Sequence, residues 1–151
     1  MSEVRAGTRM VLRRGMTMNS TDKIDPNRIN TTSLAFIGDA VYSVYIRRHV
    51  VMSGTENAEK LHQMAVSYVR AEAQAEAIKA VYDDLSPEYQ ALVRRARNRR
   101  SHSKPKHADA MTYKWSTAFE ALIGYLYLSG ETERMEDLIG KAIAITEEHR
   151  K

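Results

Sequence analysis

Residues 34–46 read LAFIGDAVYSVYI, and this stretch decides the fold class. Apolar residues recur along it at the three- and four-residue spacing of one helix face: Leu34, Ile37, Val41, Val44 and Tyr45. Outward from it the same helical periodicity continues, and no stretch alternates with the period of two that is typical of a strand. The sequence therefore predicts an all-α fold, a helical bundle.

Start and stop signals divide the rest of the chain into further helices. Ser86 and Pro87 combine a preferred N-cap residue with a preferred first helical residue. Ser129 and Gly130 mark the end of a strongly apolar helix, and Thr132 opens the last one. Helices are expected over 31–46, 57–65, 68–82, 86–96, 119–128 and 132–143.

The chain of 151 residues has the length of one domain. Residues 1–27 are polar and basic and lack apolar periodicity, so we expect a flexible basic N-terminal arm or a stretch ahead of the true start. Residues 28–151 are expected to form a single folded domain. Because neither an apolar signal region nor a membrane-length apolar run is present, the expected location is the cytoplasm, with no membrane partner.

Composition excludes several kinds of chemistry. The chain has no cysteine, which rules out disulfides, thiol nucleophiles and thiolate metal sites. The five histidines include no pair at metal-binding spacing. A net charge of +4 permits a polyanionic partner without identifying one.

The basic charge is concentrated between Tyr89 and Ala108, a window without Asp or Glu that holds seven of the 23 Lys and Arg residues. A basic helix end that runs into a basic loop is suited to binding phosphates. A solvated, charge-rich connection is the alternative that the pattern leaves open.

Two carboxylates lie beside apolar helix faces. At about 100° per residue, Asp39 falls near Tyr42, and Glu120 falls beside Ile123. A carboxylate held against a core needs a metal ion, a cationic side chain or water as its partner. Mg²⁺ prefers such oxygen ligands and keeps several waters, so these two acids are the candidate metal ligands.

Each of these acids has a glycine nearby in its own helix, Gly38 and Gly124. Glycine inside a helix costs about 1 kcal/mol relative to alanine, so close approach of another backbone is the expected reason. Such an approach would bring the two acids together. Asp109 lies 11 residues before Glu120, about 16 Å along one helix, so we expect it to be an N-cap or first-turn acid instead.

These residues also carry a family likeness. Residues 34–42, LAFIGDAVY, resemble the signature helix of the ribonuclease III catalytic domain, and residues 119–128, FEALIGYLYL, resemble the second acidic helix of that family. The likeness is greater to the Mini-ribonuclease III subgroup and extends through Arg97-Asn98, Pro105-Lys106, Asp109, Thr112-Tyr113 and Ser116 to Glu120. It covers about residues 28–148.

The resemblance implies an all-α endonuclease that forms a homodimer and cleaves double-stranded RNA with Mg²⁺. It implies that Asp39 and Glu120 are catalytic metal ligands, and that the chain lacks a separate double-stranded-RNA-binding domain. The implied substrate is the precursor of 23S ribosomal RNA, with a ribosomal protein as an expected further partner. The RNA-binding residues expected from the basic window are Arg97, Asn98, Arg100, Lys104 and Lys106.

The chain departs from the wider family at three acidic positions, which are Thr32, Ala35 and Thr117 here. With only two matching carboxylates, one Mg²⁺ completed by water and phosphate is expected rather than two. A non-catalytic RNA-binding module and a helical interaction protein are the two rival functions. Trp115 is open to two interpretations, a buried anchor or a base-stacking residue.

Overall fold

The computed structural model describes residues 25–100 and 109–150. Within these ranges every regular element is a helix, which confirms the all-α prediction. The elements are η1 (Pro26–Arg28), α2 (Thr31–Val51), α3 (Ala58–Val69), α4 (Ala71–Val81), η2 (Tyr82–Asp84), α5 (Pro87–Asn98), α6 (Ala110–Leu128) and α7 (Thr132–Glu148).

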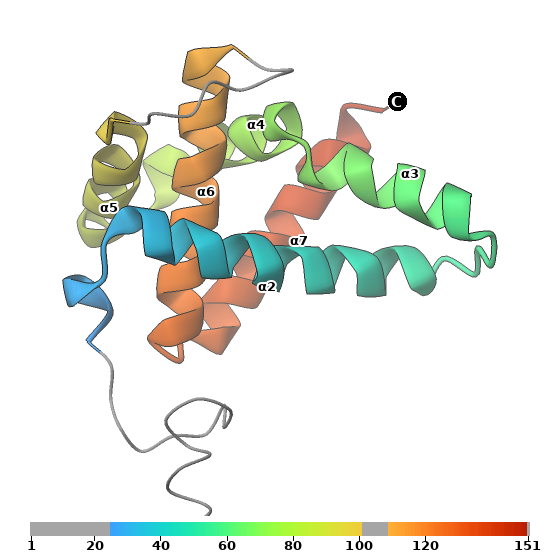
Figure 1. Cartoon of the computed structure of the whole chain (residues 1–151), viewed down its shortest axis with the longest axis horizontal. Coiled ribbons are helices and arrows are strands. Elements are labelled where there is room, and N and C mark those ends of the chain that lie inside the picture. The colour runs from blue at the N-terminus through green and yellow to red at the C-terminus, as the bar shows by residue number, and fades with distance from the viewer. Residues whose placement is uncertain (1–24, 101–108, 151) are drawn as a thin grey trace, which may run out of the picture.

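Helix α6 is the centre of the fold and packs against α2, α4, α5 and α7. In Figure 1 it stands upright, α2 runs across it, and α7 lies behind both. The predicted apolar face of α6 is confirmed, because Phe119, Leu122 and Ile123 are completely buried and Leu126 is nearly so. The other helices are therefore arranged around one apolar helix.

Helices α2 and α6 cross with their backbones in contact. A Cβ atom added to Gly38 would overlap the backbone oxygen of Glu120, and one added to Gly124 would overlap the backbone oxygen of Leu34. Only glycine fits at either position without moving a helix. The predicted close approach of the two glycine-bearing helices is confirmed.

The buried face of α2 differs from the predicted one. Val44 was expected to face the core but is 66% exposed, whereas Tyr42 and Ile46 on the neighbouring face are buried. The crossing determines this rotation, since Gly38 must face α6. The buried residues then repeat at intervals of four along the helix: Leu34, Gly38, Tyr42, Ile46 and Val50.

Helix caps follow the sequence signals with one difference. The side chain of Ser86 accepts the capping hydrogen bond of α5, as predicted, and the side chain of Asn57 does the same for α3. The cap of α2 is Asn30, whose side chain accepts from the backbone N–H of Ser33 at 2.8 Å. Thr31, Thr32 and Ser33, which are also residue types that often cap helices, are instead the first residues of the helix. Asparagine is as good an N-cap residue as serine, and the helix begins at the expected residue 31.

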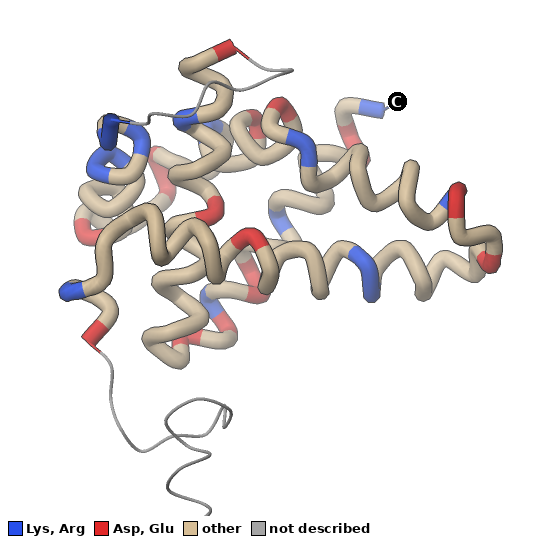
Figure 2. The backbone as a smooth tube through the Cα atoms, viewed as in Figure 1, with Lys and Arg blue, Asp and Glu red and all other residues tan. Residues whose placement is uncertain are grey.

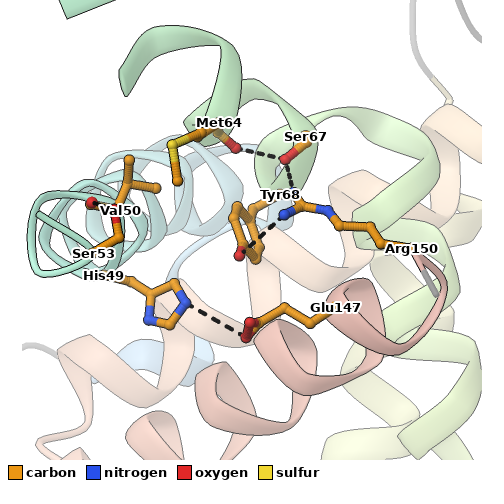
Figure 3. Close-up of polar contacts among 8 residues, drawn as sticks. All are labelled: His49, Val50, Ser53, Met64, Ser67, Tyr68, Glu147 and Arg150. Carbon is orange, nitrogen blue, oxygen red and sulfur yellow. Dashed lines mark hydrogen bonds and ion pairs between the residues drawn. The ribbon is translucent and has the colours of Figure 1, made fainter. Parts of the chain in front are cut away.

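The far end of α2 is fastened to α3 and α7 by polar contacts (Figure 3). The guanidinium of Arg150 lies over the ring of Tyr68, 4.4 Å from its centroid, and also donates to the hydroxyl of Ser67. His49 of α2 lies 3.5 Å from a carboxylate oxygen of Glu147 in α7. These contacts hold the C-terminal end of α7 against the α2–α3 pair.

The N-terminal end of the described chain is attached to α6. The hydroxyl of Tyr125 contacts the side-chain oxygen of Asn27 at 3.2 Å and donates to Glu88 at 2.8 Å. The predicted N-terminal arm therefore has its last residues, from Asp25 onward, on the domain, and its residues 1–24 lie outside the described residues. No described helix combines the length and the apolar character that a membrane span needs.

Gly38→Ala tests whether the backbone crossing controls stability. Because the new methyl group would overlap the backbone of α6, we expect the free energy of unfolding to fall by at least about 3 kcal/mol, the upper range of overpacking in cores. Chemical denaturation monitored by circular dichroism measures the change.

Gly140→Ala in α7 is the matched control, since nothing lies within 4 Å of its added Cβ. There the helix propensity of alanine should increase stability by up to about 1 kcal/mol. Equal effects of the two substitutions would contradict the crossing.

Candidate active site

The crossing of α2 and α6 lies at the floor of an open cleft of about 520 Å³. The N-terminal half of α2, the end of α5 and the first half of α6 form its walls. Its lining residues are Thr31, Thr32, Ala35, Phe36, Asp39, Ala96, Arg99, Arg100, Tyr113, Lys114, Thr117 and Glu120. The two predicted catalytic acids thus meet in one cleft with several cationic side chains.

Asp39 and Glu120 come together because their helices touch between them. Asp39 follows Gly38, and the space beside Gly38 is filled by the backbone carbonyl of Glu120. The two carboxyl groups are in hydrogen-bonding contact. Asp39 is exposed at the cleft, whereas Glu120 is half-buried in its wall. The crossing therefore converts two helix-face residues into one pair.

The electrostatics of the pair indicate that it needs a cation. Burial, followed by the hydrogen bond and the repulsion from Asp39, raises the pKa of Glu120 to about 9. Two carboxylates in contact are not both ionised in the absence of a positive charge. A hard divalent cation between them would supply that charge through the oxygen ligands it prefers. Their chemistry therefore fits a metal site.

The number of acids fits one metal ion. Across residues 25–100 and 109–150 no group of three or more His, Cys, Asp or Glu side chains is placed to hold a metal. Thr32, Ala35 and Thr117, where the wider family carries acids, all line this same cleft. The Thr117 hydroxyl donates to the backbone oxygen of Tyr113 at 3.0 Å, within its own helix. Water and phosphate oxygens would have to complete the shell of a metal held here.

Part of the cleft lining, here called the basic wall, is cationic. Arg99, Arg100 and Lys114 line the cleft with them, from the end of α5 and the first half of α6. Figure 2 shows the blue segments of α5 and of the N-terminal half of α6 gathered at one end of the molecule. Arg100 was predicted to bind RNA, whereas Lys114 and Arg99 were not among the predicted residues. Their place became visible only when α5 and α6 were brought together in the fold.

The other predicted RNA-binding residues are placed differently. The guanidinium of Arg97 covers the ring of Trp115, 4.9 Å from its centroid, and its Nε donates to the side-chain oxygen of Asn98 at 3.1 Å. Neither Arg97 nor Asn98 belongs to the cleft lining. Lys104 and Lys106 lie outside the described residues.

Trp115 is a half-buried anchor in this structure. Its ring packs against the core, meets Tyr82 edge-on with the centroids 6.1 Å apart, and has Lys79 at 5.7 Å as well as Arg97 near its face. With cations at its ring, the side chain is used within the protein. Of the two interpretations from the sequence, the anchor is the one that the contacts favour.

Two further residues complete the description of the acids. Asp109 caps α6, where its carboxylate accepts from the backbone N–H and the hydroxyl of Thr112, and these bonds lower its pKa. This is the predicted capping role. Gln74 of α4 is buried, and its side-chain amide lies within interaction range of the Glu120 carboxyl group. Gln74 was not among the predicted residues, although an amide among the alanines and apolar residues of α4 is the signal that could have identified it.

A comparison with protein-family models matches most of the described chain. The model of the ribonuclease III domain matches residues 32–131, a range that contains Asp39, Glu120 and the whole described cleft lining except Thr31. The match therefore covers both acidic helices.

Individual relatives extend the match. The chain is 48% identical over 115 residues to a Mini-ribonuclease 3 of Thermoanaerobacter sp., which covers 76% of this chain and 81% of the relative. It is 47% identical over 122 residues to a Mini-ribonuclease 3 of Streptococcus pneumoniae, covering 80% of this chain and 95% of the relative. A crystal structure of a protein from Fusobacterium nucleatum is similar with a TM-score of 0.75 and 29% identity, covering 85% of this chain and 99% of that one.

Proposed function

This chain belongs to the ribonuclease III domain family, and from that membership we propose that Asp39 and Glu120 hold one Mg²⁺ ion where double-stranded RNA is hydrolysed. The observation that carries the proposal is the contact between the two carboxyl groups at the crossing of α2 and α6. Two acids forced together in a cleft with a basic wall suit a cation and a phosphate.

The class of enzyme follows from the family. The chain is a metal-dependent endoribonuclease that cleaves double-stranded RNA. Maturation of the 23S ribosomal RNA precursor in the cytoplasm is the role we propose, since it is the role implied by likeness to the Mini-ribonuclease subgroup. A ribosomal protein partner is proposed on the same ground.

The chain's own residues divide the work in the cleft. Asp39 and Glu120 would hold the metal, and hydrolysis by an activated water requires no histidine, serine or cysteine nucleophile. When bound, Mg²⁺ lowers the pKa of coordinated water and offsets negative charge on the phosphate. Arg99, Arg100 and Lys114 are placed to hold backbone phosphates beside the acids.

This arrangement suits a duplex. The groups available in the cleft are charges that bind phosphates, and A-form RNA is recognised largely through its shape and backbone. We retain Arg97, Asn98, Lys104 and Lys106 as proposed RNA-binding residues, because they belong to the same basic window. Arg97 would act from the edge of the cleft, where Trp115 holds it.

The proposed partner of the chain is a second copy. Helix α2 buries one face on α6 and yet exposes large apolar side chains: Phe36 is 80% exposed, Val44 66%, Val51 57% and Met52 75%. Phe36 also lines the cleft, one helical turn before Asp39. A symmetric dimer through α2 would cover these side chains and place two clefts on one duplex.

Asp39→Asn and Glu120→Gln test the catalytic pair. Each change removes a metal-binding charge with little change in shape, so Mg²⁺-dependent cleavage of a double-stranded RNA should fall by about 100-fold or more. Gel assays with Mg²⁺ and with chelator measure it, and circular dichroism and RNA binding should be retained. Asp137→Asn on the exposed face of α7 is the control and should cleave normally. Tight binding by the unaltered protein without cleavage under any metal would identify a non-catalytic RNA-binding module.

Lys114→Ala tests the basic wall. Loss of one phosphate contact should weaken RNA binding and reduce the slope of log affinity against log salt concentration by about 1. Fluorescence anisotropy in a Glu120→Gln background measures binding without cleavage. Lys60→Ala, an exposed position on α3, is the control. An unchanged slope would remove Lys114 from the proposed interface.

Phe36→Asp tests the dimer. The unaltered protein should have twice the 17.2 kDa chain mass at micromolar concentration, and the charged side chain should shift it to the monomer. Light scattering after gel filtration measures the mass. Met111→Asp introduces the same charge at another exposed apolar residue and should leave the dimer intact. A monomeric mass for the unaltered protein would rule out the dimer.

A further inference from the structure

We propose that Gln74 is a positioning residue of the active site, whose side-chain amide holds the Glu120 carboxylate in the orientation that binds the metal. This inference rests on the proposed function of Asp39 and Glu120 as metal ligands. It adds a fourth helix, α4, to a site that otherwise consists of α2, the end of α5 and α6.

The position of Gln74 is one that an apolar residue would be expected to fill. Gln74 is 2% exposed and shares a helix face with Ile78 and Val81, which are 0% and 8% exposed. This face belongs to a helix that packs against α6. Burying an amide without a hydrogen-bond partner costs on the order of 1–3 kcal/mol, so its presence here requires a partner.

The partner is Glu120. The Gln74 amide lies within interaction range of the Glu120 carboxyl group, where a donor favours the ionised form of the carboxyl group. In the described part of the chain, no buried side-chain nitrogen or oxygen lacks a hydrogen-bond partner. The buried amide of Gln74 in α4 therefore has its partner in Glu120 of α6, which is one of the two proposed metal ligands.

A neutral donor has a specific advantage at this place. A lysine or arginine would neutralise Glu120 and compete with the cation for the carboxylate. An apolar side chain would leave the carboxyl group free to turn toward Asp39, its other hydrogen-bond partner. The amide fixes the direction of the carboxylate and leaves its charge for the metal, as outer-shell donors do at metal sites.

The backbone of α4 can deliver this short side chain because its buried neighbours are small. Ala73, Ala75 and Ala77 are 7%, 3% and 1% exposed, and alanine permits two helices to pack closely. The helix begins directly after Arg70, which caps both α3 and α4, so its start is fixed by the preceding helix. The donor is thus mounted on a rigid element.

Gln74→Met provides the test, because methionine has a similar length and shape but no N–H donor. The Mg²⁺ concentration for half-maximal cleavage should rise by about 10-fold, the lower end of the loss seen for outer-shell partners. The KM for RNA should not change, and saturating Mg²⁺ should restore most of kcat. Without RNA, the Mg²⁺ concentration that raises the melting temperature should shift by the same factor.

Ile78→Val is the matched control on the same face of α4. This substitution removes buried volume one helical turn after Gln74 and leaves the Gln74 amide in place. It should therefore lower the melting temperature and leave the Mg²⁺ concentration for half-maximal cleavage unchanged. An equal Mg²⁺ shift in this variant would overturn the inference, since packing alone would then explain it. If Gln74→Met does not fold, Gln74→Asn keeps the amide one methylene short and should raise the midpoint as well.

The two proposals fail in different ways. An unaltered protein that shows neither metal-dependent cleavage nor a metal-dependent melting temperature would refute the proposed function of the acids. An unaltered protein that depends on Mg²⁺, together with a folded Gln74→Met protein of equal Mg²⁺ midpoint, would refute only the role of Gln74.

Discussion

The contact between the backbones of α2 and α6 is the constraint on which the rest of the structure depends. Two glycines, Gly38 and Gly124, let each helix rest on a carbonyl of the other. This contact selects the buried face of α2, and it sets the carboxyl group of Asp39 beside that of Glu120. The same few atoms therefore determine how the core is packed and where the chemistry takes place.

Charge is distributed around this contact in three zones. The acids lie at the crossing, the neutral amide of Gln74 supports Glu120 from the core, and the cationic side chains line the same cleft. Each zone matches a different ligand, since carboxylates bind a metal and cations bind phosphates. The neutral amide of Gln74 orients the Glu120 carboxylate and competes neither for the metal nor for the phosphate.

Local signals in the sequence predicted much of the fold and of the candidate site. Asp39, Glu120 and their glycines follow from helix periodicity and from the cost of glycine within a helix, and Ser86 and Asp109 follow from capping chemistry. The exposure of Val44 did not follow, because the rotation of α2 is fixed by a helix that begins more than sixty residues later in the chain. Gln74 and Lys114 were missed for the same reason, since each acquires its role only from a neighbour in another helix.

The crossing also couples the thermal stability of the active site to the thermal stability of the fold. Since the acids are carried on backbones in direct contact, a separation of the helices that admits even one side-chain atom between them also separates the two ligands. We therefore expect no loosened yet active intermediate on heating. Inactivation and global melting are then a single event, and residual cleavage after a heat pulse counts the molecules that kept or regained the native fold.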